Sequence, residues 1–155
     1  MKRLFIAAAL LTALGATSAA LATGATPITE KVLGAAGIAR PYTIPVSKPA
    51  DVVVAKATVP PGASFGWHYH RAAVVAVVTC GALSLYDSAD RTCTPRRISA
   101  GQGFVENKNH IHLARNEGTK PAVVLVTYLG LKHGVSPDVP AVSPGNCPFR
   151  HRRCI

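Results

Sequence analysis

Residues 62–81 read GASFGWHYHRAAVVAVVTCG and join a pair of histidines to a run of valines and alanines. A β-branched run of this kind is typical of a β-strand. Residues two positions apart on a strand face the same way, so His68 and His70 are expected to share a face. A second pair, His110 and His112, lies in another strand-like stretch. Two such pairs in an all-β fold can supply three or four imidazole nitrogens to one divalent metal.

Short β-branched runs separated by turn residues continue on both sides of this stretch. No long helical period interrupts them, and this pattern is typical of an antiparallel sandwich or barrel. We therefore expect one all-β domain over residues 51–130. The expected strands are residues 52–59, 72–79, 82–86, 96–98, 103–105, 111–115 and 122–129.

The segments that flank this domain differ from it in composition. Residues 23–50 predict a lead-in, with a short helix suggested at residues 30–36 before a stretch that contains three prolines. Residues 131–155 are rich in Pro and Gly and are expected to cross the surface as a tail. Cysteines in this tail can tie it to the domain.

The first 22 residues predict an export signal. Lys2 and Arg3 precede an apolar run over residues 4–15 and the cleavage-like sequence Ala20-Leu21-Ala22. We expect cleavage after Ala22 and export to the medium, periplasm or envelope, with no membrane span left in the mature chain. A retained anchor is the alternative, although the apolar run is short for a span.

The chain is strongly basic, with 17 Lys and Arg against 7 Asp and Glu and a formal net charge of +10 at pH 7. This charge favours acidic partners. The basic residues are scattered, however, and no aromatic-rich nucleic-acid motif accompanies them. A solvated basic surface is therefore favoured over nucleic-acid binding.

The chain contains four cysteines, and an even number in an exported chain is typical of two disulfides. They lack the CxxC spacing of a zinc ribbon or a redox motif, which favours a structural role. The residues alone leave all three pairings open. The cysteines are Cys80, Cys93, Cys147 and Cys154.

Two stretches of the sequence resemble the motifs of the cupin family. Gly62 to Gly81, with His68-Tyr69-His70 inside it, resembles the first cupin motif. Residues 101–116, which contain His112 and end at Asn116, are similar to the second. The resemblance covers residues 50–130. It implies a double-stranded β-helix, a jelly-roll barrel whose interior holds a metal and a small ligand.

The sequence departs from the family pattern at two places. The position of the family's glutamate ligand falls on Val74, which cannot bind a metal. Asn107 and Asn109 stand where the family usually has the proline and glycine of a turn. Asparagine tolerates left-handed turn conformations, so we expect the turn to be kept and the carboxylate ligand to be lost.

Spacing and resemblance together make His68, His70 and His112 the predicted ligands of one divalent transition metal: Fe, Mn, Zn, Ni or Cu. His110 is a reserve ligand if its strand is extended, but a position in the turn is the favoured interpretation. Three neutral ligands leave the full charge on the metal, which favours a small anionic ligand.

Two further residues are candidates for catalysis, Glu106 and Tyr86. Glu106 is the only carboxylate near the second motif; it can act as a ligand or a general base, but we interpret it first as a turn residue. Phe65, Phe104 and Tyr128 are expected to line the barrel cavity, although core packing alone also accounts for them.

Secreted cupin-like proteins that resemble this chain often carry TCTP and NCPF segments, found here at residues 92–95 and 146–149. The resemblance favours a disulfide between Cys93 and Cys147, which leaves Cys80 to pair with Cys154.

The first functional hypothesis is an exported cupin-like protein that binds one metal and a small anionic ligand, with a dioxygenase or isomerase as its enzymatic form. The alternatives are a non-catalytic binding or sensing cupin and an envelope protein whose basic tail contacts anionic surfaces. The edges of jelly-roll sheets commonly pair between chains, so a homodimer is expected.

Overall fold

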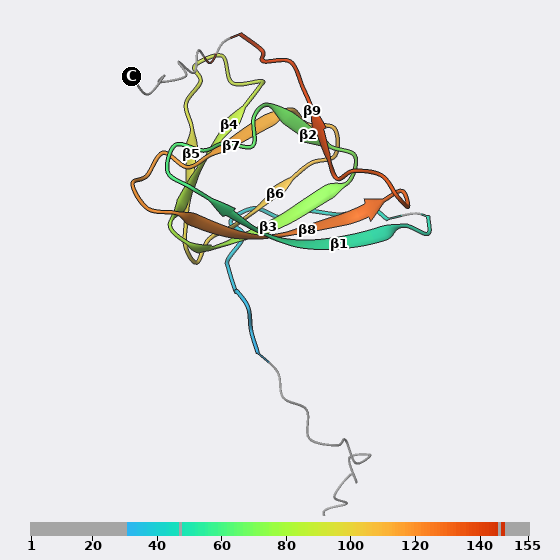
Figure 1. The fold of residues 1–155 in the computed structure, drawn as a ribbon. Helices are drawn as coiled ribbons and strands as arrows, with labels where there is room; N and C mark the ends of the chain where they lie inside the picture. Colours follow the sequence, from blue (N-terminus) through green and yellow to red (C-terminus); the bar gives the residue numbers. More distant parts are fainter. Residues whose placement is uncertain (1–30, 47, 146, 148–155) are drawn as a thin grey trace, which may run out of the picture. The chain divides into compact units, whose positions relative to one another are not determined.

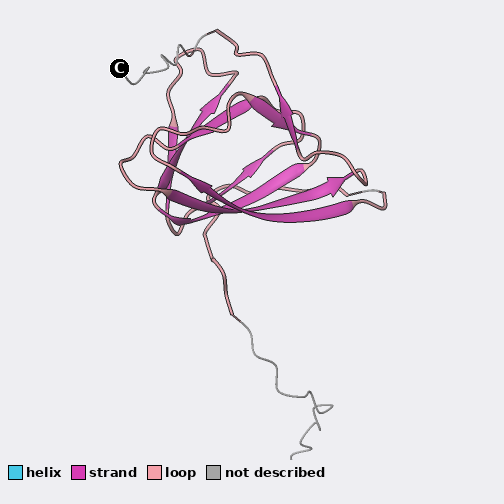
Figure 2. Cartoon of the chain, viewed as in Figure 1, coloured by secondary structure: helices cyan, strands magenta, loops and turns pink. Residues whose placement is uncertain are grey.

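The computed structural model describes residues 31–46, 48–145 and 147 of the 155-residue chain. The predicted signal peptide and Cys154 lie outside these residues. The described residues form strands joined by loops and turns, as Figure 2 shows. The strands are β1 (Asp51–Val59), β2 (His68–His70), β3 (Ala73–Cys80), β4 (Ala82–Asp87), β5 (Arg96–Ser99), β6 (Gly103–Glu106), β7 (His112–Arg115), β8 (Ala122–Leu131) and β9 (Asp138–Pro140).

The strands form two antiparallel sheets, which make the two walls of the barrel (Figure 1). One sheet has the order β1-β8-β3-β6, and the other has the order β5-β4-β7-β2-β9. The seven strands expected from the sequence are all present, with bounds shifted by no more than two residues. The predicted all-β jelly-roll fold is confirmed.

The core between the sheets forms because every second side chain along a strand points inward. In β3, the side chains of Val74, Ala76 and Val78 are buried, and the residues between them are only partly covered. Val124 of the adjacent strand β8 and Leu83 of β4, in the opposite sheet, belong to the same core. Each fully buried Val or Leu stabilises the fold by about 1.5–3 kcal/mol, so this core carries much of the barrel's stability.

A second cluster of buried side chains forms where Trp67, Tyr86, Leu113 and Cys147 pack together. Tyr86 and Leu113 are cross-strand partners, and Tyr86 alternates along β4 with Leu83 and Leu85, which face the main core. The Cys93–Cys147 disulfide, which the family resemblance implied, joins this cluster and anchors the end of the described tail. Cys80 is exposed and has no disulfide partner among the described residues, so its pairing with Cys154 stays a prediction.

The described parts of the flanking segments contain less helix and more strand than the sequence predicted. The described residues 31–36 of the lead-in contain no helix. A Cβ on Gly34 would lie only 2.7 Å from Thr79 Cγ2, so the lead-in packs closely against β3, and its Gly37 pairs with Gln102. The C-terminal segment, expected to be a surface tail, contributes β9 to a sheet. No helix among the described residues is long and apolar enough to span a membrane.

Candidate metal centre

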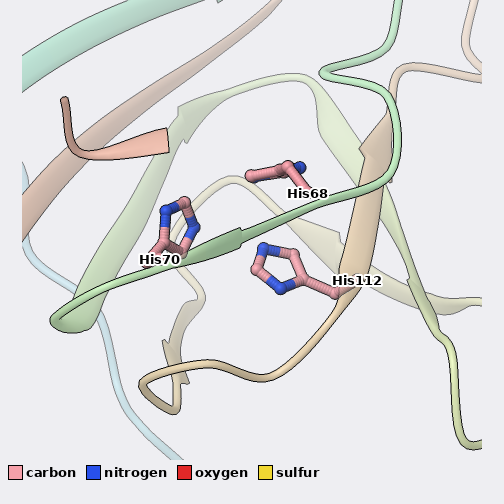
Figure 3. A group of neighbouring side chains, drawn as sticks. All are labelled: His68, His70 and His112. Atoms are coloured by element: carbon pink, nitrogen blue, oxygen red, sulfur yellow. The ribbon is translucent and has the colours of Figure 1, made fainter. Parts of the chain in front are cut away.

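Three histidines from two adjacent strands come together inside the barrel. His68 and His70 lie at the ends of β2, and His68 pairs across the sheet with His112 of β7. Figure 3 shows the three rings facing one another. One ring nitrogen from each side chain can be chosen so that all three nitrogens lie within 4.8 Å of one another, and all three residues are buried. The structure therefore brings together the three ligands predicted from the sequence.

The outer nitrogen of each ring is held by an acceptor. His68 Nδ1 lies 2.9 Å from the Gly66 carbonyl oxygen, and His112 Nδ1 lies 2.9 Å from that of His110. His70 Nδ1 lies 3.2 Å from the carbonyl oxygen of Pro137. Because a carbonyl only accepts, each Nδ1 carries the hydrogen and, in the neutral ring, Nε2 keeps its lone pair. Metal-binding histidines in proteins are usually held in this way.

A carboxylate completes the cluster, contrary to our expectation. Glu106 was interpreted first as a turn residue, but it ends β6 and its side chain is only 12% exposed. Its Oε2 lies 3.1 Å from His70 Nε2, and its Oε1 lies 3.1 Å from His112 Nε2. Glu106 is the direct cross-strand partner of Val74, the position at which the family's glutamate is missing. The expectation of a cluster without a carboxylate is therefore wrong, because the neighbouring strand places one there.

The charges in the cluster depend strongly on one another. Burial alone raises the pKa of Glu106, but the nearby ring nitrogens of His112 and His70 outweigh it and lower the pKa to about 2. Burial lowers the pKa of His70, but hydrogen bonds to Asp138 and Glu106 raise it to about 9. Burial lowers the pKa of His68. In the metal-free protein at neutral pH, the cluster thus holds an ionised carboxylate beside a protonated His70.

The donor set fits a divalent transition metal. His112 Nε2 is buried and makes no well-aligned hydrogen bond among the described residues, even to Glu106 at 3.1 Å. Two ligand atoms that each lie about 2.1 Å from one metal are at most about 4.2 Å apart. The spacings of 3.1 Å between Glu106 and the two imidazoles fall within this limit. An imidazole and carboxylate donor set suits Zn, Fe, Mn, Ni and Cu alike.

A small cavity adjoins the histidines and is otherwise mostly apolar. Phe65, Phe104 and Tyr128, the predicted lining residues, all border it together with His68 and His70. Its volume is about 30 Å³. Typical ligand pockets measure about 300–1,000 Å³, so a larger ligand needs space elsewhere.

A larger groove, of about 880 Å³, reaches the cluster at Glu106 and His112. Arg40 of the lead-in and Arg96 and Arg97 of β5 line it. Asp87 and Asp90 line it as well, and so does Glu106, which contacts the histidines. The groove therefore offers a route to the cluster that is edged by arginines.

Two other candidate residues lie apart from the cluster. His110 sits in the turn before β7, is 40% exposed and pairs with Asp87 at 2.9 Å. The hydroxyl of Tyr86 donates to Glu117, and burial and Glu117 raise its pKa to about 12. Alternation along β4 turns Tyr86 away from the main core, because Leu85 occupies the inward position.

Asp138 is a member of the cluster that sequence reasoning missed. Its Oδ1 lies 3.0 Å from His70 Nδ1 and accepts from the Tyr128 hydroxyl at 3.2 Å. Asp138 lies in the segment expected to be a tail, and only the pairing of β9 with β2 brings it to the site. No local signal in the sequence indicated this contact.

The family model described as "Cupin domain" matches residues 55–128. No curated protein matches the chain.

A DMSP lyase, DddQ from Ruegeria pomeroyi DSS-3, is 18% identical with a TM-score of 0.51, and the match covers 63% of this chain and 46% of that one. A chain from the structures of the DMSP lyases RdDddP and RnDddQII is 21% identical with a TM-score of 0.50, covering 59% and 44%. The chain thus spans less than half the length of these proteins, and the likeness shows a shared fold. The match to the family model, together with the two antiparallel sheets, shows that the chain contains a cupin domain over residues 55–128.

Proposed function

We propose that this cupin binds one divalent transition metal through His68, His70, His112 and Glu106. The observation that carries the proposal is the direction of the rings: each Nδ1 faces an acceptor. The Nε2 atoms of His70 and His112 lie beside one carboxylate. A merely structural cluster has no need for a buried His112 Nε2 that makes no well-aligned hydrogen bond within the described part of the chain. When bound, the metal acts as a Lewis acid and has coordination positions open to a ligand.

We propose that the ligand is small and anionic and reaches the cluster through the arginine-edged groove. The cavity of about 30 Å³ is too small for an organic ligand. The groove of about 880 Å³ has this space and contacts both Glu106 and His112. No ion pair joins Arg40 or Arg96 to an acid within the described part of the chain, so both can attract an anion.

A dioxygenase or isomerase is the enzymatic form of this proposal. The cavity provides Tyr128, whose pKa is raised by burial and by Asp138, so its hydroxyl stays protonated and can donate to a ligand. Glu106 is the one carboxylate among the described lining residues of the cavity. If it is held by the metal, no free base is left beside the ligand. The lack of a free base favours the alternative, a binding or sensing cupin without catalysis. A panel of substrates distinguishes this alternative from an enzyme.

Oxygen consumption and product formation separate the two forms. The panel contains small thiols, diketones and hydroxy acids. It also contains dimethylsulfoniopropionate, because two structures that share the fold come from DMSP lyases. Turnover that depends on metal supports the enzyme, and saturable binding without turnover supports the binding protein.

We also propose that the chain is exported. The disulfide between Cys93 and Cys147 supports this location, because such bonds persist in oxidising compartments. The signal-like residues 1–22 supply the route. Amino-terminal sequencing of the protein recovered outside the cytoplasm is expected to begin at Thr23; full-length protein confined to the cytoplasm would contradict this.

Metal analysis of protein purified without a histidine tag tests the central proposal. The parent is expected to hold one metal per chain after loading and removal of excess metal. His112→Ala is expected to hold far less than one. His110→Ala is the matched control, because His110 belongs to the same sequence motif but pairs with Asp87 outside the cluster. A parent without stoichiometric metal would overturn the proposal.

A further inference from the structure

His70 differs from the other two histidines in what holds its ring. His68 and His112 each use a carbonyl two residues earlier in the chain, at Gly66 and His110. These contacts are local and form wherever the strand itself forms. His70 Nδ1 instead faces the Pro137 carbonyl and the Asp138 carboxylate, a separation of 67 residues to Pro137. The direction of this ring therefore depends on a distant segment.

Asp138 is well placed to fix that direction. Its Oδ1 lies 3.0 Å from His70 Nδ1, closer than the Pro137 carbonyl oxygen at 3.2 Å. The His70 side chain is only 3% exposed and the Asp138 side chain is 44% exposed, so this contact joins a buried ring to a carboxylate at the edge of the cluster. The Tyr128 hydroxyl donates to the same Oδ1 at 3.2 Å and limits the movement of the carboxylate. Tyr128 also stacks edge-on to the His70 ring, with centroids 5.3 Å apart.

The segment that carries Asp138 is held firmly against the histidine strand. In the pairing of β9 with β2, Asp138 stands directly opposite His70. The Ala141 amide donates to the Trp67 carbonyl at 2.9 Å, just before the first histidine. The disulfide at Cys147 fastens the segment further on. The three residues that this segment contributes, Asp138, Ala141 and Cys147, lie beyond residues 55–128, the part of the chain that matches the cupin domain.

We propose that Asp138 is a positioning residue that holds His70 with Nδ1–H outward and Nε2 toward the metal, so that the C-terminal segment completes the site. This rests on the proposed metal-binding function. A carboxylate behind a metal-bound imidazole fixes its tautomer and increases its basicity. Loss of such a partner typically weakens metal binding about 10- to 100-fold.

The test is a zinc titration against a competing chelator, with the full chain and its disulfide intact. Asp138→Ala is expected to bind zinc about 10- to 100-fold more weakly than the parent. Asp138→Asn keeps an acceptor oxygen at the same place and is expected to recover part of that loss. Asp87→Ala is the matched control, because Asp87 is similarly exposed and its carboxylate pairs with His110 at 2.9 Å rather than with a histidine of the cluster. It is expected to bind zinc as the parent does.

A cobalt-loaded sample gives a second measurement that a general loss of stability does not mimic. The visible absorption of bound Co²⁺ reports the arrangement of its ligands, so Asp138→Ala is expected to change this spectrum while Asp87→Ala does not. Parent-like zinc affinity and an unchanged spectrum in Asp138→Ala would overturn the positioning role and leave the metal site standing. A parent that binds neither metal would instead overturn the proposed function and, with it, the role of Asp138.

Discussion

At the scale of single residues, the main feature of the site is that its carboxylate lies on β6 rather than on the neighbouring strand β3. Val74 occupies the family's glutamate position, and Glu106 stands directly opposite it on β6. Both side chains face the barrel interior, where Val74 is fully buried and Glu106 contacts two imidazoles. Cross-strand partners lie close enough that either position can present a carboxylate to the same region.

We predict that exchanging these two residues preserves metal binding. Glu106→Val alone is expected to weaken zinc binding more than 10-fold, because it removes the only carboxylate that the described residues place beside the Nε2 atoms. Adding Val74→Glu is expected to restore much of the affinity, which a chelator competition titration measures. A double variant as weak as Glu106→Val, though folded, would show that the two positions do not share one site.

The metal-free protein is predicted to lose stability as the pH rises from about 6.5 to about 9. The pKa of His70 is raised from 6.5 to about 9, so its contribution is fully present below 6.5 and is lost as the pH rises through 9. The pKa of Glu106 is lowered from 4.5 to about 2, so its contribution is present above 4.5 and is lost as the pH falls through 2. Thermal unfolding of parent and Glu106→Gln at several pH values checks this. The two curves are expected to converge toward pH 9, and a gap that widens would contradict the assignment.

At the scale of elements, the strands were predictable because their period of two is strong and local. The run of buried and partly buried residues in β3 shows this pattern directly. β9 was missed because it has only three residues and ends in a proline, and its pairing partner lies far away in the sequence. The helix suggested within residues 30–36 was wrong because packing of Gly34 against β3 overrides a weak local preference.

The candidate site likewise has residues that could be predicted from the sequence and residues that could not. The sequence predicted His68, His70 and His112 because residues two positions apart on a strand face the same way. Glu106 was misread because its role depends on the register between β3 and β6, which the sequence does not display. The turn before His112 kept its shape through Asn109, whose φ of 62° is the left-handed conformation expected of asparagine there.

The disulfide is predicted to stabilise the element that carries Asp138. It closes a loop across a sequence separation of 54 residues, and replacing both Cys93 and Cys147 by Ser is expected to cost about 2–4 kcal/mol of unfolding free energy. Because the tail is then less firmly held, zinc affinity is expected to fall as well. Denaturant unfolding and chelator titration measure the two effects, and unchanged values in both would contradict a structural role for the bond.

At the scale of the whole molecule, the outer face of β1, β3 and β8 is apolar although the chain is basic, and the lead-in covers the part of it around Val77, Thr79 and Leu125. Val52 and Val54 of β1 are 61% and 71% exposed, and Lys56 is the only charged residue among the outward positions of these strands. The formal charge of +10 makes two copies repel elsewhere, whereas this face brings few like charges together. We therefore expect the homodimer to form through this face.

Sedimentation velocity tests this expectation. The parent is predicted to sediment as a dimer, and Val54→Lys is predicted to shift it toward the monomer by adding like charges to the contact. Val142→Lys is the control, because Val142 is 89% exposed and lies in the C-terminal segment rather than on this face. A monomeric parent, or a Val54→Lys dimer as stable as the parent's, would contradict it.

The proposed function depends on where a metal binds. Anomalous diffraction from crystals of the zinc-loaded protein, recorded on both sides of the zinc absorption edge, locates the metal directly. We predict one strong peak per chain, within bonding distance of Nε2 of His68, His70 and His112 and of a carboxylate oxygen of Glu106. A peak elsewhere, or no peak in crystals of fully loaded protein, would contradict the account.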